Sequence, residues 1–393
     1  MSSSLHLWSY YGLRSQVWLY RLLGHLDRRP AHLLVRREWL TGRPVEEFSW
    51  PAARLHWFPG HALPARLAAK LVPYVRSGNR NALNALDARF VRDLIRRIGA
   101  RVLHVHFGWL AADILSASPE FGVPVVVSLY GSDVFRAHGA YLRKLQRLLR
   151  GRYRFVVTSQ ALRAAAISLG AAPEQVHVIP VGIDTVTLPA ESQVTAHRKK
   201  VLVDSPLRIV TVGRFVGCKA PQELPRVARI VADKGLALEW TVVGDGPLLP
   251  DFVRNAEELG VRERFTVKGS LPSAEVQKLL WDSDVMVLNA VVAPDGEREA
   301  LGVVLIEAGA MGLPVVSCRV GGIPEIVEDG ATGILVEPGD PNALAAGVLR
   351  LAQEPDRRFA MGMAALRRTR ALFDSHALAQ RLEALYDQCL VQN

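Results

Sequence analysis

The sequence predicts an α/β protein built from two parallel-sheet domains in tandem. Its 393 residues exceed the length at which a single hydrophobic core stops growing. Short apolar segments of strand length alternate with helical segments, which is the rhythm of βαβ units. This rhythm lapses between Asp184 and Leu207, where the chain is polar, charged and proline-containing, and then restarts. We therefore predict a first domain at 1–190, a linker at 191–207 and a second domain at 208–393.

The first half begins with a strand that includes LHLWS, from Leu5, followed by a glycine-containing loop and the helix VWLYRLLGHL. Further strands are expected at 32–35, 54–58, 102–106, 124–129, 155–158 and 176–179. Because helical stretches separate most of these strands, we expect a parallel sheet covered on both faces.

The segment 58–99 departs from this pattern. Its second part, ALNALDARFVRDLIRRIG, has apolar residues at helical spacing beside four arginines. A basic amphipathic helix can lie on a membrane surface, but more often it is a surface helix with a solvated charged face.

The second half predicts strands at 208–212, 238–243, 265–267, 285–288, 314–317 and 333–336, and then a helical tail from Pro341 with no obvious chemistry. Two parallel sheets in tandem leave a cleft between the carboxyl ends of their strands. Ligands of open α/β sheets bind at such ends, so we expect the site there.

Composition points to an ordinary globular protein, with 49% apolar and 22% charged residues. The three cysteines, Cys218, Cys318 and Cys389, are far apart and odd in number, which fits neither a disulfide framework nor a zinc site. The N-terminus lacks the pattern of a cleaved signal, and the apolar run 300–318 contains Glu307 and Pro314. We expect a cytoplasmic protein.

Positive charge is concentrated in the first half. The net charge is +10, and residues 1–190 hold 25 Lys and Arg against 11 Asp and Glu, whereas the remainder holds 23 against 27. A basic half can attract nucleic acid, anionic lipid or a phosphorylated substrate. No nucleic-acid-binding signature accompanies it, so we expect no nucleic acid but a peripheral contact with anionic membrane, which would place the protein at the inner face.

The stretch EREALGVVLIEAGAMGLPVVSCRVGG places Glu299 and Glu307 eight residues apart across an expected helix start at Gly302-Val303. Free amides at a helix N-terminus favour an anion, and carboxylates accept hydrogen bonds from hydroxyls. The pair would suit a ligand that is part sugar and part phosphate. The spacing alone is equally compatible with an ordinary pair, in which Glu299 is a solvated loop residue and Glu307 is a buried glutamate with its hydrogen bonds satisfied.

Other motifs of the second half lie at expected strand ends. VGRFVGCK places Arg214 and Lys219 there, two cations that could hold a diphosphate, although either one alone would be an ordinary surface charge. VVGDGP contributes Gly244 and Gly246, and VKGSLP contributes Gly269. Such turns let main-chain groups approach a ligand, but they are also common tight turns.

In the first half, HVHFG places His106 at a strand end and SLYGSD places Tyr130, Gly131 and Asp133 at the next. A lone histidine on an apolar strand is more often structural than catalytic. The sequence has no HExxH, GxSxG, P-loop or paired CxxC motif, which excludes the commonest metalloprotease, serine-hydrolase, NTPase and zinc functions.

Taken together, these motifs resemble the retaining glycosyltransferases of family 4. The likeness is strongest from 208 to 340, in VGRFVGCK, VVGDGP, VKGSLP, the E-x7-E pair and GLPVVSCRVGGIPEIVEDGATGILVEPGD; HVHFG, SLYGSD and VHVIPVGID extend it into the first half. The DG-x-x-E spacing is most similar to the branch that builds exopolysaccharide and lipid-linked glycans. The resemblance implies the GT-B fold, two facing Rossmann-like domains with a donor cleft, in which the first domain holds the acceptor and the second the nucleotide sugar.

The resemblance also implies a reaction. A hexose-type sugar would pass with retention from a UDP- or GDP-sugar to a hydroxyl of a glycan, lipid-linked or small-molecule acceptor. Alternatives are a nucleotide-sugar-binding partner subunit without catalysis, or a GT-B epimerase or phosphorylase.

Roles follow from the same resemblance. Arg214 and Lys219 would bind the diphosphate with the amides of Gly302 and Val303, Glu307 the ribose, and Glu299 the transferred sugar. His106 and Asp133 would line the acceptor side, and no metal or other cofactor would be required.

Three positions depart from the family pattern. Tyr130 stands where many members have histidine, so the role of that position in holding the sugar is open. Ala220 replaces a glycine, and Asn289-Ala290 replaces a common Pro-Ser pair.

Overall fold

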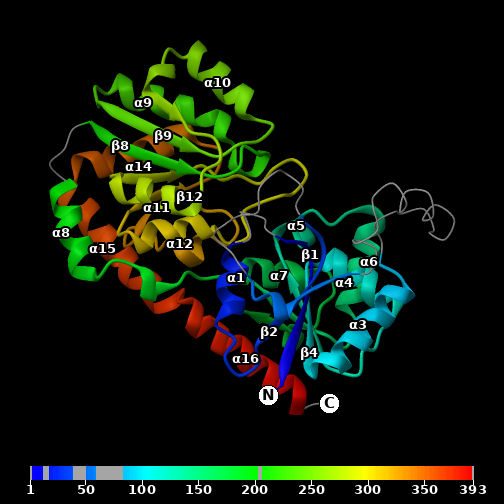
Figure 1. Ribbon diagram of the computed structural model, residues 1–393. Coiled ribbons are helices and arrows are strands. Elements are labelled where there is room, and N and C mark those ends of the chain that lie inside the picture. Colours follow the sequence, from blue (N-terminus) through cyan, green and yellow to red (C-terminus); the bar gives the residue numbers. More distant parts are fainter. Residues whose placement is uncertain (1, 12–16, 39–49, 59–82, 202–205, 392–393) are drawn as a thin grey trace. The chain divides into compact units, whose positions relative to one another are not determined.

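The protein is described from a computed structural model, in which residues 2–11, 17–38, 50–58, 83–201 and 206–391 are placed (Figure 1). The chain forms two compact units, each with its own parallel sheet. The first unit comprises Met1–Thr158, Leu162–Val181 and Ser375–Asn393, and the second comprises Ser159–Ala161 and Gly182–Asp374.

The sheet of the first unit has the strand order β3-β2-β1-β4-β5-β6-β7. Its strands are β1 Ser3–Tyr11, β2 Ala31–Glu38, β3 Leu55–Trp57, β4 Ala100–His106, β5 Val125–Leu129, β6 Arg154–Val157 and β7 Val176–Val178. The helices are α1 Val17–Gly24, α3 Ala85–Ile98, α4 Gly108–Ala117, α5 Gly131–Phe135, α6 Gly139–Leu149, α7 Gln160–Ser168 and α16 Ser375–Val391.

The sheet of the second unit has the order β10-β9-β8-β11-β12-β13. Its strands are β8 Leu207–Val212, β9 Leu238–Val243, β10 Phe265–Val267, β11 Val285–Leu288, β12 Val315–Cys318 and β13 Gly333–Val336. The helices are α8 Glu191–Val201, α9 Leu224–Asp233, α10 Leu249–Glu258, α11 Ser273–Asp282, α12 Val303–Ala310, α13 Ile323–Ile326, α14 Pro341–Gln353 and α15 Pro355–Leu372.

The predicted parallel α/β architecture is confirmed in both halves, and every predicted strand is present to within a few residues. The cause is local: the strands are short, rich in Val, Ile and Leu, and buried on both faces of a helix-covered sheet. In both sheets the strand order reverses beside the first strand, between β1 and β4 and between β8 and β11. Ligands of doubly wound sheets bind at the carboxyl ends of the strands at such points.

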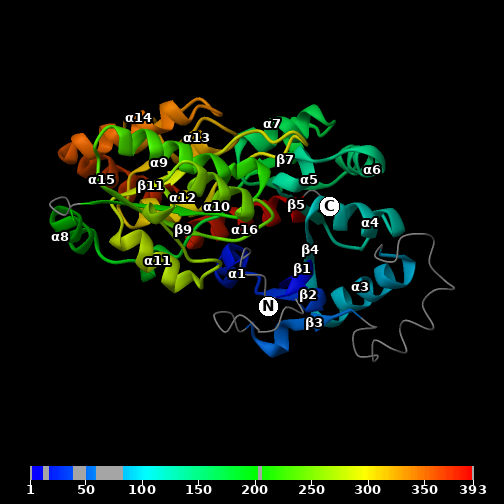
Figure 2. The same cartoon turned by 90° about the horizontal axis from the view of Figure 1, so that it is seen from above.

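Helices cover both faces of the first sheet. One face packs on α3, α4 and α7 and the other on α1 and α16 (Figure 2). The last helix, α16, is far from this sheet in sequence, yet Tyr386 is fully buried against it. Glu383 accepts hydrogen bonds from the backbone amides of Arg28 and Arg29, at 2.7 and 3.0 Å. The tail is helical, as predicted, but α16 builds the first unit rather than the second.

Within the predicted linker at 191–207, residues 191–201 form the helix α8. Val194 of α8 is buried against Met363 and Leu366 of α15, which anchors a helix that reads as polar in sequence. Arg198 is also buried and donates to the carbonyl oxygens of Leu280, Ser283 and Met311. The second unit begins at Gly182, before the predicted boundary, and ends at Asp374.

The basic amphipathic helix predicted at the end of the segment 58–99 is α3, whereas 59–82 lie outside the described residues. Its apolar side chains Ala88, Val91, Leu94 and Ile95 are buried in the core of the first unit. This is the surface helix with a solvated charged face, since the apolar stripe is already covered. Across the described part of the chain, no helix has the length and apolarity needed to span a membrane.

Candidate functional site

Main-chain hydrogen bonds join three loops at the carboxyl edge of the second sheet. The amide of Gly213, after β8, donates to Val243; Phe215 donates to Asp245, after β9; and Gly244 donates to Gly269, after β10. The three glycine-containing motifs predicted separately therefore form one backbone surface beside the β8–β11 reversal.

Gly244 and Gly246 are required by this arrangement. Both have positive φ, 136° and 152°. A Cβ on Gly244 would lie 1.9 Å from the carbonyl oxygen of Gly213, and one on Gly246 would lie 2.6 Å from that of Phe215. Gly269 also has positive φ, 65°, but no atom of the described residues lies within 4 Å of a Cβ position, so conformation and not space selects glycine there.

Lys219 and Glu299 form an ion pair at this edge. Lys219 ends the short helical turn Gly217–Lys219 after β8, and Glu299 lies in the loop between β11 and α12. Both side chains are mostly covered, with 15% and 16% of their surface exposed. Burial alone would raise the pKa of Glu299, but the Lys219 charge, its hydrogen bond and the amide of Leu301 lower the pKa below its ordinary value. Glu299 is therefore ionised at neutral pH.

Arg214 is more open than Lys219. Its side chain is 67% exposed, and its Nη2 lies 3.7 Å from Oε1 of Glu297. Sequence reasoning missed Glu297, although its place two residues before Glu299 gave a signal: alternate residues of an extended loop point the same way. Each predicted cation thus faces a carboxylate of the same loop, Arg214 facing Glu297 and Lys219 facing Glu299.

The predicted helix start is confirmed. α12 begins at Val303 with Gly302 as its N-cap, in the left-handed region at φ 95°. A Cβ on Gly302 would lie 3.6 Å from Cγ of Glu299, so the acidic side chain lies beside the helix N-terminus. Glu307 is in the second turn of α12 and partly exposed.

Gly321 and Gly322 hold the Glu299 loop in place. The amide of Gly322 donates to the carbonyl oxygen of Glu299 at 3.2 Å. A Cβ on Gly321 would lie 1.8 Å from that oxygen, and one on Gly322 would lie 2.2 Å from the carbonyl oxygen of Ala300. The close contacts of Gly321 and Gly322 therefore hold the backbone of Glu299 in place.

Two departures from the family pattern contact each other. Ala220 directly follows Lys219 and has φ 36°, a left-handed conformation that favours glycine. The buried amide of Asn289 donates to the Ala220 carbonyl oxygen at 3.0 Å, and Asn289 Oδ1 lies 3.5 Å from Cys318 Sγ. Asn289 therefore fixes the turn that carries Lys219, a role that sequence reasoning did not assign.

In the first unit, His106 belongs to a buried group of three histidines. His6 on β1 and His104 and His106 on β4 share one face of the sheet, and their ligand-type atoms lie within 4.8 Å of one another. All six ring nitrogens are hydrogen-bonded. His6 bonds Ser4 and His106 at 3.0 and 3.1 Å, His104 bonds Tyr386 and Ser128 at 2.6 and 2.8 Å, and His106 also bonds Tyr130 at 3.0 Å.

This environment keeps the histidines neutral. Burial, reinforced by neighbouring imidazoles, lowers the pKa of His6 and His104 well below the ordinary 6.5, and burial lowers the pKa of His106 to about 3. A metal ion could use three of these nitrogens only by displacing their present hydrogen bonds. The geometry is that of a network that fixes strands to one another.

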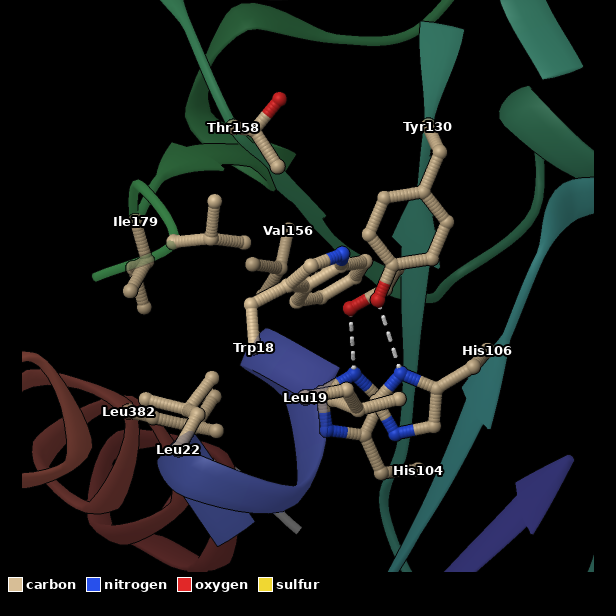
Figure 3. A pocket seen from close by; sticks show the side chains of 12 residues that line it. Trp18, Leu19, Leu22, His104, His106, Tyr130, Val156, Thr158, Ile179 and Leu382 are labelled. Atoms are coloured by element: carbon tan, nitrogen blue, oxygen red, sulfur yellow. Dashed lines mark hydrogen bonds between the residues drawn. The ribbon is translucent and has the colours of Figure 1, made fainter. Parts of the chain in front are cut away.

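His106 is 1% exposed, and Tyr130 covers its outer nitrogen (Figure 3). A small cavity of about 10 Å³ adjoins this pair, lined by Tyr130, His104, His106 and apolar side chains of α1, including Trp18 and Leu19. That volume is near the space one water needs. His106 is therefore enclosed beneath Tyr130, and its expected role on the acceptor side stays a prediction.

Asp133 is also turned inward, with 1% exposure. Its carboxylate accepts hydrogen bonds from the backbone amides of Tyr130, at 2.9 Å, and of Gly108 and Trp109, so it ties the start of α5 to that of α4. Burial outweighs these hydrogen bonds and raises its pKa to about 6. The oxygens of Asp133 are thus already hydrogen-bonded to the backbone, and its expected role on the acceptor side stays a prediction.

Comparisons with known proteins match both halves. The model of Glycosyltransferase Family 4 matches residues 15–187, and that of Glycosyl transferases group 1 matches residues 193–368. The chain is 28% identical over 294 residues to the amylovoran biosynthesis glycosyltransferase AmsK of Erwinia amylovora, covering 74% of this chain and 70% of AmsK. It is 28% identical over 333 residues to the putative colanic acid biosynthesis glycosyltransferase WcaL of Salmonella typhimurium, covering 82% and 77%.

The solved structure of HepE from Anabaena, in complex with UDP, has a similar fold. Its TM-score is 0.75 at 20% identity, with 99% of this chain and 100% of HepE covered. Together with the two sheets and the paired family matches, this identifies the chain as a member of glycosyltransferase family 4, an enzyme with the two-domain α/β GT-B fold.

Proposed function

We propose that this glycosyltransferase moves a hexose-type sugar, with retention of configuration, from a nucleotide diphosphate sugar to an acceptor hydroxyl. The observation that carries the proposal is the Lys219–Glu299 ion pair beside the N-terminus of α12, where the strand order of the second sheet reverses. A cation, a carboxylate and free helix amides in one place suit a ligand that joins a phosphate to a sugar.

In this proposal each group meets one part of the donor. Lys219 and Arg214 bind the diphosphate with the amides of Gly302 and Val303, because both cations lie after β8 and Gly302 lies beside Glu299. The second-turn carboxylate of α12, Glu307, accepts hydrogen bonds from the ribose hydroxyls. The backbone around Gly244, Gly246 and Gly269 contacts the nucleoside.

Glu299 holds the hydroxyls of the transferred sugar. The bond between the anomeric carbon and the diphosphate oxygen breaks while the acceptor hydroxyl bonds to the same face. The acceptor proton passes to the departing diphosphate. Lys219, Arg214 and the helix amides stabilise the charge that develops on the leaving group, so no divalent metal is required in this scheme.

The acceptor is a glycan, a lipid-linked glycan or a small molecule with a free hydroxyl. The names of AmsK and WcaL, both biosynthetic enzymes of polysaccharides, favour a glycan or a lipid-linked intermediate. The UDP of the HepE structure favours a UDP-sugar as donor, and GDP-sugars are included among the donors to be tested. We place the reaction in the cytoplasm, in keeping with three buried, unpaired cysteines, and at a membrane when the acceptor is lipid-linked.

The test is a panel of UDP- and GDP-sugars incubated with the full chain and lipid-linked or soluble acceptors, followed by donor loss and the anomeric configuration of the product. Glu299→Gln should lower turnover about 100-fold or more while nucleotide affinity, from calorimetry, changes only a few-fold. Glu257→Gln, an exposed carboxylate on α10, is the matched control.

Consumption of no donor by the unmodified chain would overturn the transferase proposal, and inversion in the product would overturn retention. Full turnover of the Glu299→Gln variant would remove Glu299 from the site. Chelation by EDTA should leave the rate unchanged, and a loss restored by a divalent cation would reject the metal-free scheme.

A further inference from the structure

One face of α6 carries a row of arginines. Residues 134–173 contain eight Lys and Arg and no Asp or Glu. Within this stretch Arg143 and Arg147 lie on α6 and Arg150 is its C-cap residue. At 100° per residue these three positions fall within an arc of about 60°, along about 10 Å of helix axis.

Packing of the opposite face of α6 on the core turns this row of arginines outward. Leu145, Leu148 and Leu149 of α6 are buried, and the helix packs on α4 (Figure 2). The neighbouring cation Lys144 is neutralised by Asp113 of α4 at 3.0 Å. Arg143, Arg147 and Arg150 are all exposed. The direction of the arginine face is thus set by packing on the opposite side of the helix.

The three guanidinium groups have no partner among the described residues. Within the described ranges, none of the three makes a hydrogen bond or an ion pair. By contrast, Arg89 and Arg96 on α3 both lie within 4.0 Å of Asp93. With Gln146, the α6 arginines line a shallow hollow of about 290 Å³. Unpaired guanidinium forks are suited to phosphate oxygens, which they can bind through two parallel hydrogen bonds.

We propose that this arginine face of α6, formed by Arg143, Gln146, Arg147 and Arg150, binds the phosphate groups of anionic lipids at a membrane surface. A row about 10 Å long exceeds one phosphate group, which favours a surface that carries many phosphates. Bases of single-stranded nucleic acid need aromatic platforms, whereas the aromatic residue of α6, Tyr141, turns its hydroxyl toward Asp133. The inference is independent of the donor site in the second unit.

The experiment is co-sedimentation of the full chain with vesicles of phosphatidylcholine alone and with phosphatidylglycerol added. Binding should require the anionic lipid and should fall as salt is raised, since the screening length shortens to about 3 Å at 1 M. The double variant Arg143→Gln/Arg147→Gln should weaken partitioning about 25-fold, or about fivefold for each arginine.

The matched control removes the same charge elsewhere. Arg89→Gln/Arg96→Gln takes two arginines from α3, where both are near Asp93, and should change partitioning less than about threefold. Donor turnover with a soluble acceptor should be the same in both double variants as in the unmodified chain, so a failed transferase assay leaves this test intact.

Equal weakening by both double variants would overturn the proposal in favour of net charge alone. Binding of neutral vesicles, or no binding of anionic ones, would also overturn it. Displacement by glycerol phosphate at constant ionic strength would assign the face to a soluble phosphate ester, and tighter binding to an oligonucleotide that is lost in the α6 variant would assign it to nucleic acid. Either result rejects the lipid surface.

Discussion

Two groups of polar residues lie near the strand-order reversals of the two sheets, and they differ in how their polar atoms are satisfied. In the first unit the imidazoles of His6, His104 and His106 are buried and all six nitrogens are hydrogen-bonded within the protein. In the second unit Lys219 and Glu299 lie in loops with part of each side chain exposed.

This difference distinguishes a structural hydrogen-bond network from an ion pair that a ligand could reach. In a buried network whose donors and acceptors are all paired, no hydrogen-bonding group is left for a ligand. Leaving any member unpaired is costly in free energy, so the network fixes the geometry of its strands. An ion pair that keeps part of its surface exposed can exchange its partners for those of a ligand, because the ligand's charges and hydroxyls replace the interactions that are lost. Strand-end position alone does not distinguish these cases, whereas burial and hydrogen-bond count do.

The largest effect is expected for Lys219→Ala. Removing the ammonium should lower kcat/KM about 100- to 1,000-fold, because the developing negative charge of the diphosphate loses a preplaced cation. Nucleotide affinity, measured by calorimetry, should also fall. Lys234→Ala, an exposed lysine after α9, is the control and should leave both values unchanged. A Lys219→Ala enzyme with full activity would reduce the contrast between the two groups to a difference of burial.

For the first group, His106→Ala should act on stability. The change removes one hydrogen bond from Tyr130 and one from His6 and opens a cavity, so we expect the free energy of unfolding of the first unit to fall by about 2–4 kcal/mol. Urea denaturation checks this, with the exposed His138→Ala as control. If His106→Ala instead stays fully stable and loses turnover, His106 belongs to the reaction and the contrast is broken.

Acidification should lower the stability that the same histidine network provides. The folded-state pKa of each of the three histidines lies below the ordinary 6.5, so below that pH the unfolded chain binds more protons and stability falls. Asp133 opposes this trend, because its folded pKa of about 6 exceeds its ordinary 3.8 and the folded state binds its proton first.

Each histidine contributes a slope of at most about 1.4 kcal/mol per pH unit, and the slope is largest well below the unfolded pKa. Thermal unfolding followed between about pH 6.5 and 5, mostly above the range of ordinary carboxyl groups, measures the sum of these contributions and of those from His32, His56, His177 and His197, whose pKa values burial also lowers. Asp133→Asn removes the opposing term and should steepen the dependence. A flat profile in the unmodified chain would show that the histidines titrate normally and are not locked in the network.

The smallest effects concern the turn that carries Lys219. Asn289→Ala removes the hydrogen bond to Ala220 and should cost about 1–3 kcal/mol of stability. It should also lower kcat more than it raises KM if Lys219 loses its position. Ala220→Gly relieves a left-handed alanine and should stabilise by about 0.5–1 kcal/mol at unchanged kcat. Thermal unfolding and steady-state kinetics of both variants test these expectations. If the role of Asn289 is purely structural, kcat stays unchanged.

The amino-acid sequence by itself determined the strands, their grouping into two parallel sheets, the α12 start and the glycine-containing loops after β8, β9 and β10. These features depend on short-range periodicity, on strands buried on both faces and on glycines at positive φ, all of which leave a local signature.

Tertiary structure alone decided which polar residues meet. Lys219 reaches Glu299 over 80 residues, His6 reaches His106 over 100, and His104 reaches Tyr386 over 282. It also decided that α16 covers the first sheet and that Asn289 supports Ala220. The physical reason is that burial and long-range hydrogen bonding decide which polar side chains are enclosed and which keep exposed surface, and neither property has a period in the chain.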